Sequence, residues 1–149
     1  MDFFQGVWSN KVLAVSLTAW LIAQALKVVT TFLAHGRVDL RRFVESGGMP
    51  SSHTALVTSL SVIVGYEVGF DSALFGVTVA FALIVMYDAA GVRRAAGKQA
   101  EILNQLIREL YVEHEFKHER LRELIGHTPV EVLAGAIVGV GVAVFFATR

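Results

Sequence analysis

The chain has 149 residues, 54% of them hydrophobic, with 13 basic and 13 acidic side chains and no cysteine. Its mean hydropathy is +0.58, and soluble domains are usually only about 45–50% apolar. The composition therefore indicates a membrane protein. It excludes disulfides and thiol catalysis, and the balanced charge gives no electrostatic sign of nucleic-acid binding. The length suits one domain, residues 1–149.

Four apolar segments are long enough to cross a bilayer, which takes about 20 residues. They are Val12–Ala34, Thr54–Phe70, Ser72–Tyr87 with a continuation toward Ala90, and Val130–Ala147. The first is expected to be an uncleaved span rather than a signal peptide, because its apolar run is too long and only Lys11 precedes it. Gly69-Phe70-Asp71-Ser72 predicts a tight helical hairpin between the second and third spans. The expected fold is all-α, a membrane bundle of about four spans.

Basic residues gather in two loops. The loop His35–His53 and the loop Val92–Thr128 carry most of them, while the other side has only Lys11 and Arg149. The positive-inside rule then places both loops in the cytoplasm and both termini outside. We expect a multi-pass protein of the cell's inner (plasma) membrane.

A lysine within the first span is the first costly polar group along the chain. Lys27 follows Gln24 by three residues, in the half of the span nearest the cytoplasm. A charge within a span is a functional candidate by default. The alternative is that Lys27 only extends toward the headgroups.

The stretch Gly47-Gly48-Met49-Pro50-Ser51-Ser52-His53-Thr54 precedes the second span. The glycines predict a turn, and Pro50 is expected to be the first residue of the helix. A glycine-rich turn that leads into a helix also presents backbone N–H groups and the positive end of the helix dipole to an anion. Ser51 and Ser52 can donate further hydrogen bonds to phosphate oxygens.

Asp88 ends the third span, and an amphipathic stretch follows it. For Asp88 the plain alternative to a functional role is an ion pair with Arg93, Arg94 or Lys98. The stretch Val92–Gly126 has apolar residues near helical spacing and predicts one or two helices, lying on the membrane surface or against the other loop. Its His114 and His118 are interpreted as part of a solvated helix face.

The last span begins with a recognisable start signal. Thr128 is expected to be the N-cap, with Pro129 at the first helical position and Glu131 completing a capping box. Glu131 can also orient His127, which mirrors His53 at the cytoplasmic start of a span. Histidine can act as nucleophile or general acid near neutral pH.

Two glycines in the last span have the spacing of a helix-packing motif. Gly135 and Gly139 are four residues apart, which favours close helix packing, with a homodimer face as the alternative.

Three blocks together resemble the divergent branch of the type 2 phosphatidic acid phosphatase superfamily, which is related to acid phosphatases and vanadium haloperoxidases. The blocks are "SGGMPSSHTA", "YDAAGVRRAAGKQAEILNQL" and "GHTPVEVLAGAIVG". Pro50-Ser51-Ser52-His53 is similar to the family's Pro-Ser-Gly-His block. His127 and Glu131 keep the family's histidine-plus-four acidic spacing, with glutamate in place of aspartate. Lys27 resembles the lysine of the first block.

The resemblance implies roles for these residues. His127 would attack phosphorus, Glu131 would hold its imidazole, and His53 would protonate the leaving alcohol. Phosphate oxygens would be bound by Lys27, Ser51, Ser52 and loop N–H groups, with Gly48, Asp88 and Lys98 in support. No cofactor or metal is required, although Asp88 and Glu131 offer an alternative site for a divalent cation.

Arginine positions depart from the family pattern. No Arg-Pro follows Lys27 at the family distance, and the position six residues before His127 is Leu121. We expect Arg93 and Arg94 to substitute for the missing arginine.

The sequence therefore predicts an integral membrane phosphatase that acts on a lipid phosphate monoester, such as phosphatidylglycerophosphate or phosphatidic acid, through a phosphohistidine. One alternative is a non-catalytic membrane protein that binds an anionic lipid or a protein partner through Val92–Gly126. Another is an isoprenyl pyrophosphate phosphatase. No nucleic-acid partner is expected, and a homodimer is one way for so short a chain to complete its core.

Overall fold

The structure, a computed structural model, describes residues 2–38, 40–43, 47–110 and 127–149. Every regular element in these ranges is helical, as the composition and periodicity predict. The elements are α1 (Phe3–Trp8), α2 (Lys11–His35), the 3-10 turn η1 (Leu40–Phe43), α3 (Ser52–Val68), α4 (Ala73–Ala90), α5 (Val92–Leu110) and α6 (Pro129–Ala147).

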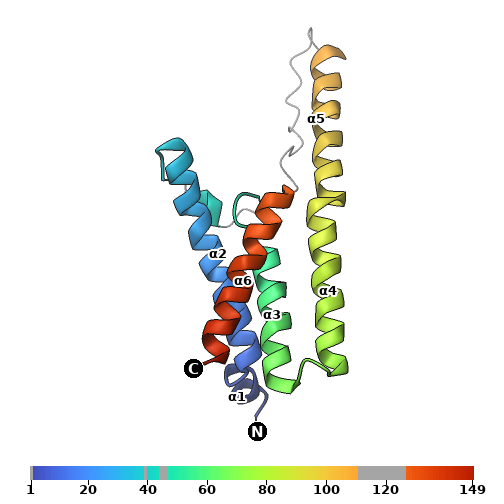
Figure 1. Cartoon of the computed structure of the whole chain (residues 1–149). Coiled ribbons are helices and arrows are strands. Elements are labelled where there is room, and N and C mark those ends of the chain that lie inside the picture. The colour runs from blue at the N-terminus through green and yellow to red at the C-terminus, as the bar shows by residue number, and fades with distance from the viewer. Residues whose placement is uncertain (1, 39, 44–46, 111–126) are drawn as a thin grey trace.

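Helices α2, α3, α4 and α6 run alternately up and down, and both termini lie at the same end of the molecule (Figure 1). Helix α3 packs against α2, α4 and α6, and α2 also packs against α6. Ten of the 17 residues of α3 are buried, so α3 is the central helix of the bundle. This alternation agrees with the expected arrangement of both termini on one side of the membrane.

Within the described residues, three helical stretches are long and apolar enough to cross a membrane: Lys11–His35, the continuous Ala73–Ile107, and Pro129–Ala147. Helix α3 has 17 residues, which corresponds to about 25 Å at 1.5 Å per residue. It is a little shorter than these three and is mostly enclosed by them. The exact count of four spans stays a prediction.

Local signals set the ends of these helices. Asn10 Oδ1 accepts a hydrogen bond from Leu13 N at 3.0 Å and starts α2, and Ser72 Oγ does the same for α4 through Phe75 N at 3.2 Å. Gly36 ends α2 with a φ of 67°, which only glycine adopts easily. Gly69 ends α3, so the expected hairpin between the second and third spans is confirmed.

Helices α2 and α3 pack antiparallel in a single register. At one end Lys11 Nζ lies 2.8 Å from Glu67 Oε1. One turn farther along, Val15 and Ile63 share a buried apolar cluster with Ala143 of α6. At the other end Lys27 meets Ser52. This register brings the lysine of the first span to the start of the second.

Helix α5 continues α4 in nearly the same direction and extends beyond the ends of α2 and α6 (Figure 1). The interpretation of a helix lying on the membrane surface is therefore wrong for Val92–Leu110. Gly91 does not turn the chain, because its N–H bonds to Tyr87 O at 2.9 Å and its carbonyl accepts from Ala95 N at 3.0 Å. Helical hydrogen bonds thus run through the junction. The expectations for His114, His118 and Gly126 lie outside the described residues.

Candidate active site

The start of α6 carries a capping box in which both hydrogen bonds are made. Thr128 Oγ1 accepts from Glu131 N at 3.3 Å, and Glu131 Oε2 accepts from Thr128 N at 2.9 Å. With Pro129 as the first helical residue, the predicted capping box is confirmed. The fixed first turn holds the Glu131 carboxylate beside the preceding residue.

That preceding residue is His127, and the same carboxylate oxygen serves it. His127 Nδ1 lies 3.1 Å from Glu131 Oε2, so the cap and the orientation of the imidazole coexist in one glutamate. A hydrogen on Nδ1, donated to the carboxylate, leaves the lone pair on Nε2. The His127 side chain is only 3% exposed. The ring is thus buried and oriented by the carboxylate.

The backbone of His127 is tied to a third helix. Its N–H donates to the carbonyl of Ala89, in the last turn of α4, at 3.1 Å. The neighbouring Asp88 is half-buried at this same helix end. The structure therefore brings the end of the third apolar segment to the start of the fourth, which nothing in the local sequence signals.

The loop before α3 contains a turn, and α3 does not begin at Pro50. Gly48 has a φ of 95° and the Met49–Pro50 peptide is cis. The prediction that Pro50 is the first helical residue is wrong, because Ser51 is the N-cap and α3 starts at Ser52. Ser51 Oγ accepts from Thr54 N at 3.4 Å and from Thr54 Oγ1 at 3.0 Å.

Ser51 and Ser52 have different surroundings. The Ser51 hydroxyl is fully buried in the cap, and its N–H donates to the carbonyl of Glu131 at 2.9 Å. This bond joins the loop before α3, residues 47–51 and hereafter the serine loop, to the first turn of α6. The Ser52 hydroxyl instead turns toward α2, where it accepts a hydrogen bond from Lys27 Nζ at 3.1 Å.

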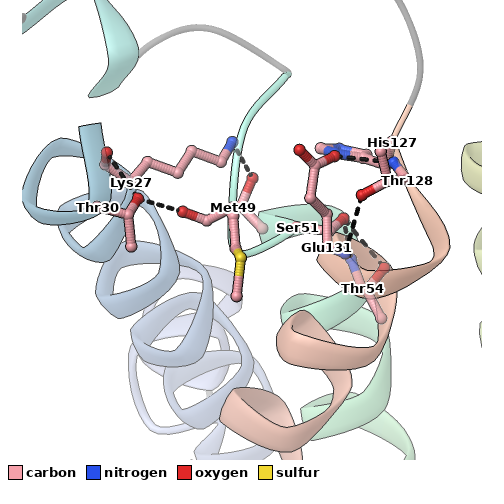
Figure 2. A network of polar contacts seen from close by, with 9 residues as sticks. Lys27, Thr30, Met49, Ser51, Thr54, His127, Thr128 and Glu131 are labelled. Atoms are coloured by element: carbon pink, nitrogen blue, oxygen red, sulfur yellow. Dashed lines mark hydrogen bonds and ion pairs between the residues drawn. The ribbon is translucent and has the colours of Figure 1, made fainter. Parts of the chain in front are cut away.

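Lys27 lies inside the bundle, with only 1% of its surface exposed. It extends from α2 toward the serine loop, opposite Glu131 and His127 of α6 (Figure 2). The alternative that Lys27 only reaches for the headgroups is therefore wrong, since its ammonium group is enclosed by protein. A buried ammonium group of this kind is expensive unless a partner stabilises it.

His53 completes the group from the first turn of α3. Its ring is half-buried, and its centroid lies 6.4 Å from that of His127. The two histidines thus face one small region from two helices, with Lys27 contributed by a third.

The predicted basic residues of the second block lie on α5. Arg93 and Arg94 are in the first turn of α5, and Lys98 is an exposed residue of the same helix. Among the residues that the structure describes, no group of three histidine, aspartate or glutamate side chains could hold a metal ion. The alternative of a cation at Asp88 and Glu131 stays a prediction.

Sequence reasoning missed the residues that hold the serine loop in place. Thr30 Oγ1 donates to the carbonyl of Met49 at 2.6 Å and fixes the loop to α2 (Figure 2). The signal available was weak: Thr30 lies three residues after Lys27, on the same face of a helix. Its partner, a main-chain carbonyl on another element, leaves no mark in the sequence.

The two glycines of the last span face α3 within the same chain. A Cβ on Gly135 would collide with the carbonyl oxygen of Ser51 and approach Thr54 Cβ at 3.0 Å. A Cβ on Gly139 would collide with Thr58 Oγ1 and the carbonyl oxygen of Ala55. Close helix packing is therefore the use of these glycines that the structure shows, and it sets the distance between the two histidine-bearing helices.

Comparison with known proteins supports the resemblance seen in the sequence. The chain is 42% identical over 143 residues to the uncharacterized membrane protein YuiD of Bacillus subtilis (strain 168), with 89% of this chain and 90% of the relative covered. No solved structure matches the chain. The family model described as "Divergent PAP2 family" matches residues 8–142. The match spans the lysine, the serine loop and both histidines, and the chain belongs to the divergent PAP2 family.

Proposed function

We propose that this protein is an integral membrane phosphatase that hydrolyses a lipid phosphate monoester through a phosphohistidine. The observation that carries the proposal is the His127–Glu131 pair, in which the carboxylate holds Nδ1 at 3.1 Å and so orients the ring for attack by Nε2. The buried Lys27 ammonium and the second histidine, in the same region, supply what a transferring phosphoryl group needs.

In the first step His127 Nε2 attacks phosphorus, and the bond from phosphorus to the lipid oxygen breaks. His53, in its protonated form, gives a proton to that oxygen, so a neutral lipid alcohol leaves. Lys27, Ser52 and the first N–H groups of α3 bind the phosphoryl oxygens, since those N–H groups have no partner within the helix. Ser51 contributes its place in the loop, because its hydroxyl caps the helix.

In the second step water attacks the phosphohistidine. His53, now neutral, takes a proton from the water, the nitrogen–phosphorus bond breaks, and inorganic phosphate leaves. Glu131 stabilises the positive charge that His127 carries in the two transition states and in the phosphohistidine. Arg93 and Arg94, at the start of α5, are proposed to supply the positive charge of the missing family arginine.

Phosphate release by detergent-purified protein tests the proposal. The panel contains phosphatidylglycerophosphate, phosphatidic acid and an isoprenyl pyrophosphate, each with and without EDTA, beside the His53→Ala and His127→Ala variants. Release from one lipid, lost in both folded variants, supports the assignment and names the substrate. Activity that survives both substitutions contradicts the roles proposed here. The proposed site faces the cytoplasm, and the C-terminus is then expected on the outer side. A cytoplasmic signal from a reporter fused after Arg149 would contradict this orientation.

A second candidate is a non-catalytic protein that binds an anionic lipid. The capping box favours it, because that box alone accounts for Glu131. The exposed apolar side chains of Ile102, Leu103 and Leu106 on α5 offer a surface for a partner. Well-folded protein that binds phosphatidic acid vesicles but releases no phosphate from any lipid would favour this candidate.

Replacement of Lys27 by methionine should separate stability from activity. Met fills a similar volume without charge, and it removes the cost of burying an ammonium group. We expect Lys27→Met to keep or raise the melting temperature in detergent while kcat/KM falls about a hundredfold or more, the size of effect typical of a lost charge-stabilising group. A matched fall in melting temperature and activity would instead make Lys27 a structural residue.

A further inference from the structure

The phosphate site lies at a level where the protein surface is still apolar. Helix α2 continues through residues 28–35 beyond Lys27, about 12 Å at 1.5 Å per residue. This extension exposes Val29, Phe32 and Leu33, the last of them 76% exposed. Exposed apolar side chains in such number indicate contact with lipid rather than water. The site is therefore surrounded by the edge of the bilayer and does not stand above it.

The groups proposed to bind phosphate are themselves enclosed. Lys27 and Ser52 are each 1% exposed and His127 is 3% exposed. On the loop that joins them, by contrast, Met49 is 43% exposed. Its side chain is the apolar part of the serine loop that an approaching molecule would meet.

The position of Met49 is fixed by its backbone. Thr30 Oγ1 holds its carbonyl at 2.6 Å, so the residue cannot move without breaking the contact between the loop and α2. The thioether points away from the loop and along the bundle, with α2 on one side and α6 on the other in the view of Figure 2. The first turns of α6 also expose Val130 and Leu133. Both helices that flank Met49 thus carry bilayer-facing apolar side chains near this level.

We propose that Met49 is a substrate-contact residue that receives the apolar chain of a lipid phosphate where the chain leaves the headgroup. The inference rests on the proposed function and adds a specificity determinant to it. Methionine is flexible and polarisable, and it suits alkyl chains that differ in shape. A soluble phosphate monoester would gain nothing from this contact, so Met49 distinguishes a lipid phosphate from a soluble one.

Kinetics with two substrates test the inference. The Met49→Gln variant keeps the length of the side chain but makes it polar. We expect its KM for a long-chain phosphatidic acid in mixed micelles to rise about tenfold, which corresponds to about 1.4 kcal/mol, because the apolar contact with the alkyl chain is lost. Its kcat/KM for p-nitrophenyl phosphate should stay within about twofold. Met49→Leu should behave like the unmodified protein with both substrates.

The control is Leu74→Gln, which also replaces an apolar side chain by an amide. Leu74 is 53% exposed and lies in the first turn of α4, whereas the other end of α4 contacts His127. The control substitution should alter neither substrate's KM. Equal losses on both substrates in Met49→Gln would overturn the inference and make Met49 structural. If neither substrate is affected by Met49→Gln, the alkyl chain of the lipid lies elsewhere and the inference is overturned. A changed oligomeric mass in detergent would show instead that Met49 contacts a second copy.

A binding measurement separates this inference from the proposed function. Phosphatidic acid with a diazirine close to its ester carbonyl is photolysed with the full-length protein, and the adduct is located by mass spectrometry. We expect labelling at Met49, suppressed by excess unlabelled phosphatidic acid but not by phosphatidylcholine. Labelling without any phosphate release would keep the lipid contact and reject the phosphatase. Phosphate release without labelling at Met49 would reject the contact alone.

Discussion

The His127→Asn variant is expected to lose phosphate release by at least about a thousandfold while it keeps its fold. The amide nitrogen of asparagine takes the place of His127 Nδ1 and can donate to Glu131 Oε2, so the 3.1 Å contact is preserved. Nothing then replaces Nε2, the atom that is proposed to attack phosphorus. The measurement is kcat for the preferred lipid, with the melting temperature in detergent as the check on folding.

The covalent intermediate gives this prediction a second readout. Brief reaction with lipid labelled in its phosphate, stopped in alkali, should leave label on the unmodified protein, since a phosphorus–nitrogen bond survives base and breaks in acid. His127→Asn should carry none. His53→Ala keeps the nucleophile, so its remaining label should decay more slowly. Label that persists in His127→Asn would move the nucleophile to another residue.

Glu131→Gln keeps the shape of the carboxylate and removes its charge. Glutamine also completes a capping box, so its oxygen can still accept from Thr128 N. The same oxygen position faces His127 Nδ1, but the neutral amide no longer stabilises the positive charge that His127 gains when it attacks phosphorus. We expect kcat to fall by roughly a hundredfold or more with little change in melting temperature. A loss of stability in proportion to activity would show that Glu131 acts through the cap alone.

The Gly135→Ala variant should damage both the packing of the bundle and the proposed site. An added Cβ meets the carbonyl oxygen of Ser51, which is backbone and cannot rotate away. Helix α6 would have to move from α3, which breaks the bond from Ser51 N to the carbonyl of Glu131 at 2.9 Å. Overpacking typically costs about 1–3 kcal/mol, and the widened gap should also separate His53 from His127. The free energy of unfolding and kcat should therefore both fall.

Gly141→Ala is the matched control in the same helix. No atom lies within 4 Å of a Cβ built on Gly141, and alanine is favoured over glycine within helices by roughly 0.5–1 kcal/mol. Stability should be unchanged or raised, with normal activity. Equal damage from Gly135→Ala and Gly141→Ala would mean that any added methyl group on α6 disturbs the protein, and that close contact with Ser51 has no special part.

Much of the fold follows from local patterns that the sequence displays. The predicted first span, Val12–Ala34, differs from α2 (Lys11–His35) by one residue at each end, because an apolar run and its caps act through neighbouring residues. The same holds for the last span and its capping box. The His127–Glu131 contact was also accessible, since residues four apart on adjoining turns lie side by side.

The remainder of the site depended on how helices pack. Lys27 and Ser52 are 25 positions apart, and only the antiparallel register of α2 and α3 brings them together. Ser51 and Ser52 look equivalent in the sequence. Their backbone conformations turn one hydroxyl into the helix cap and the other toward Lys27.

By itself the sequence determined an all-helical membrane protein, the ends of its apolar helices, and a histidine oriented by a glutamate one turn away. These features depend on composition, on hydrophobic period and on contacts within one turn. Only the tertiary structure decided that Gly135 and Gly139 pack on α3, that α5 continues α4, and that Met49 lies beside the enclosed lysine. Those outcomes depend on contacts between backbone atoms of segments that are distant in the sequence. The sequence does not indicate which main-chain carbonyls make such contacts.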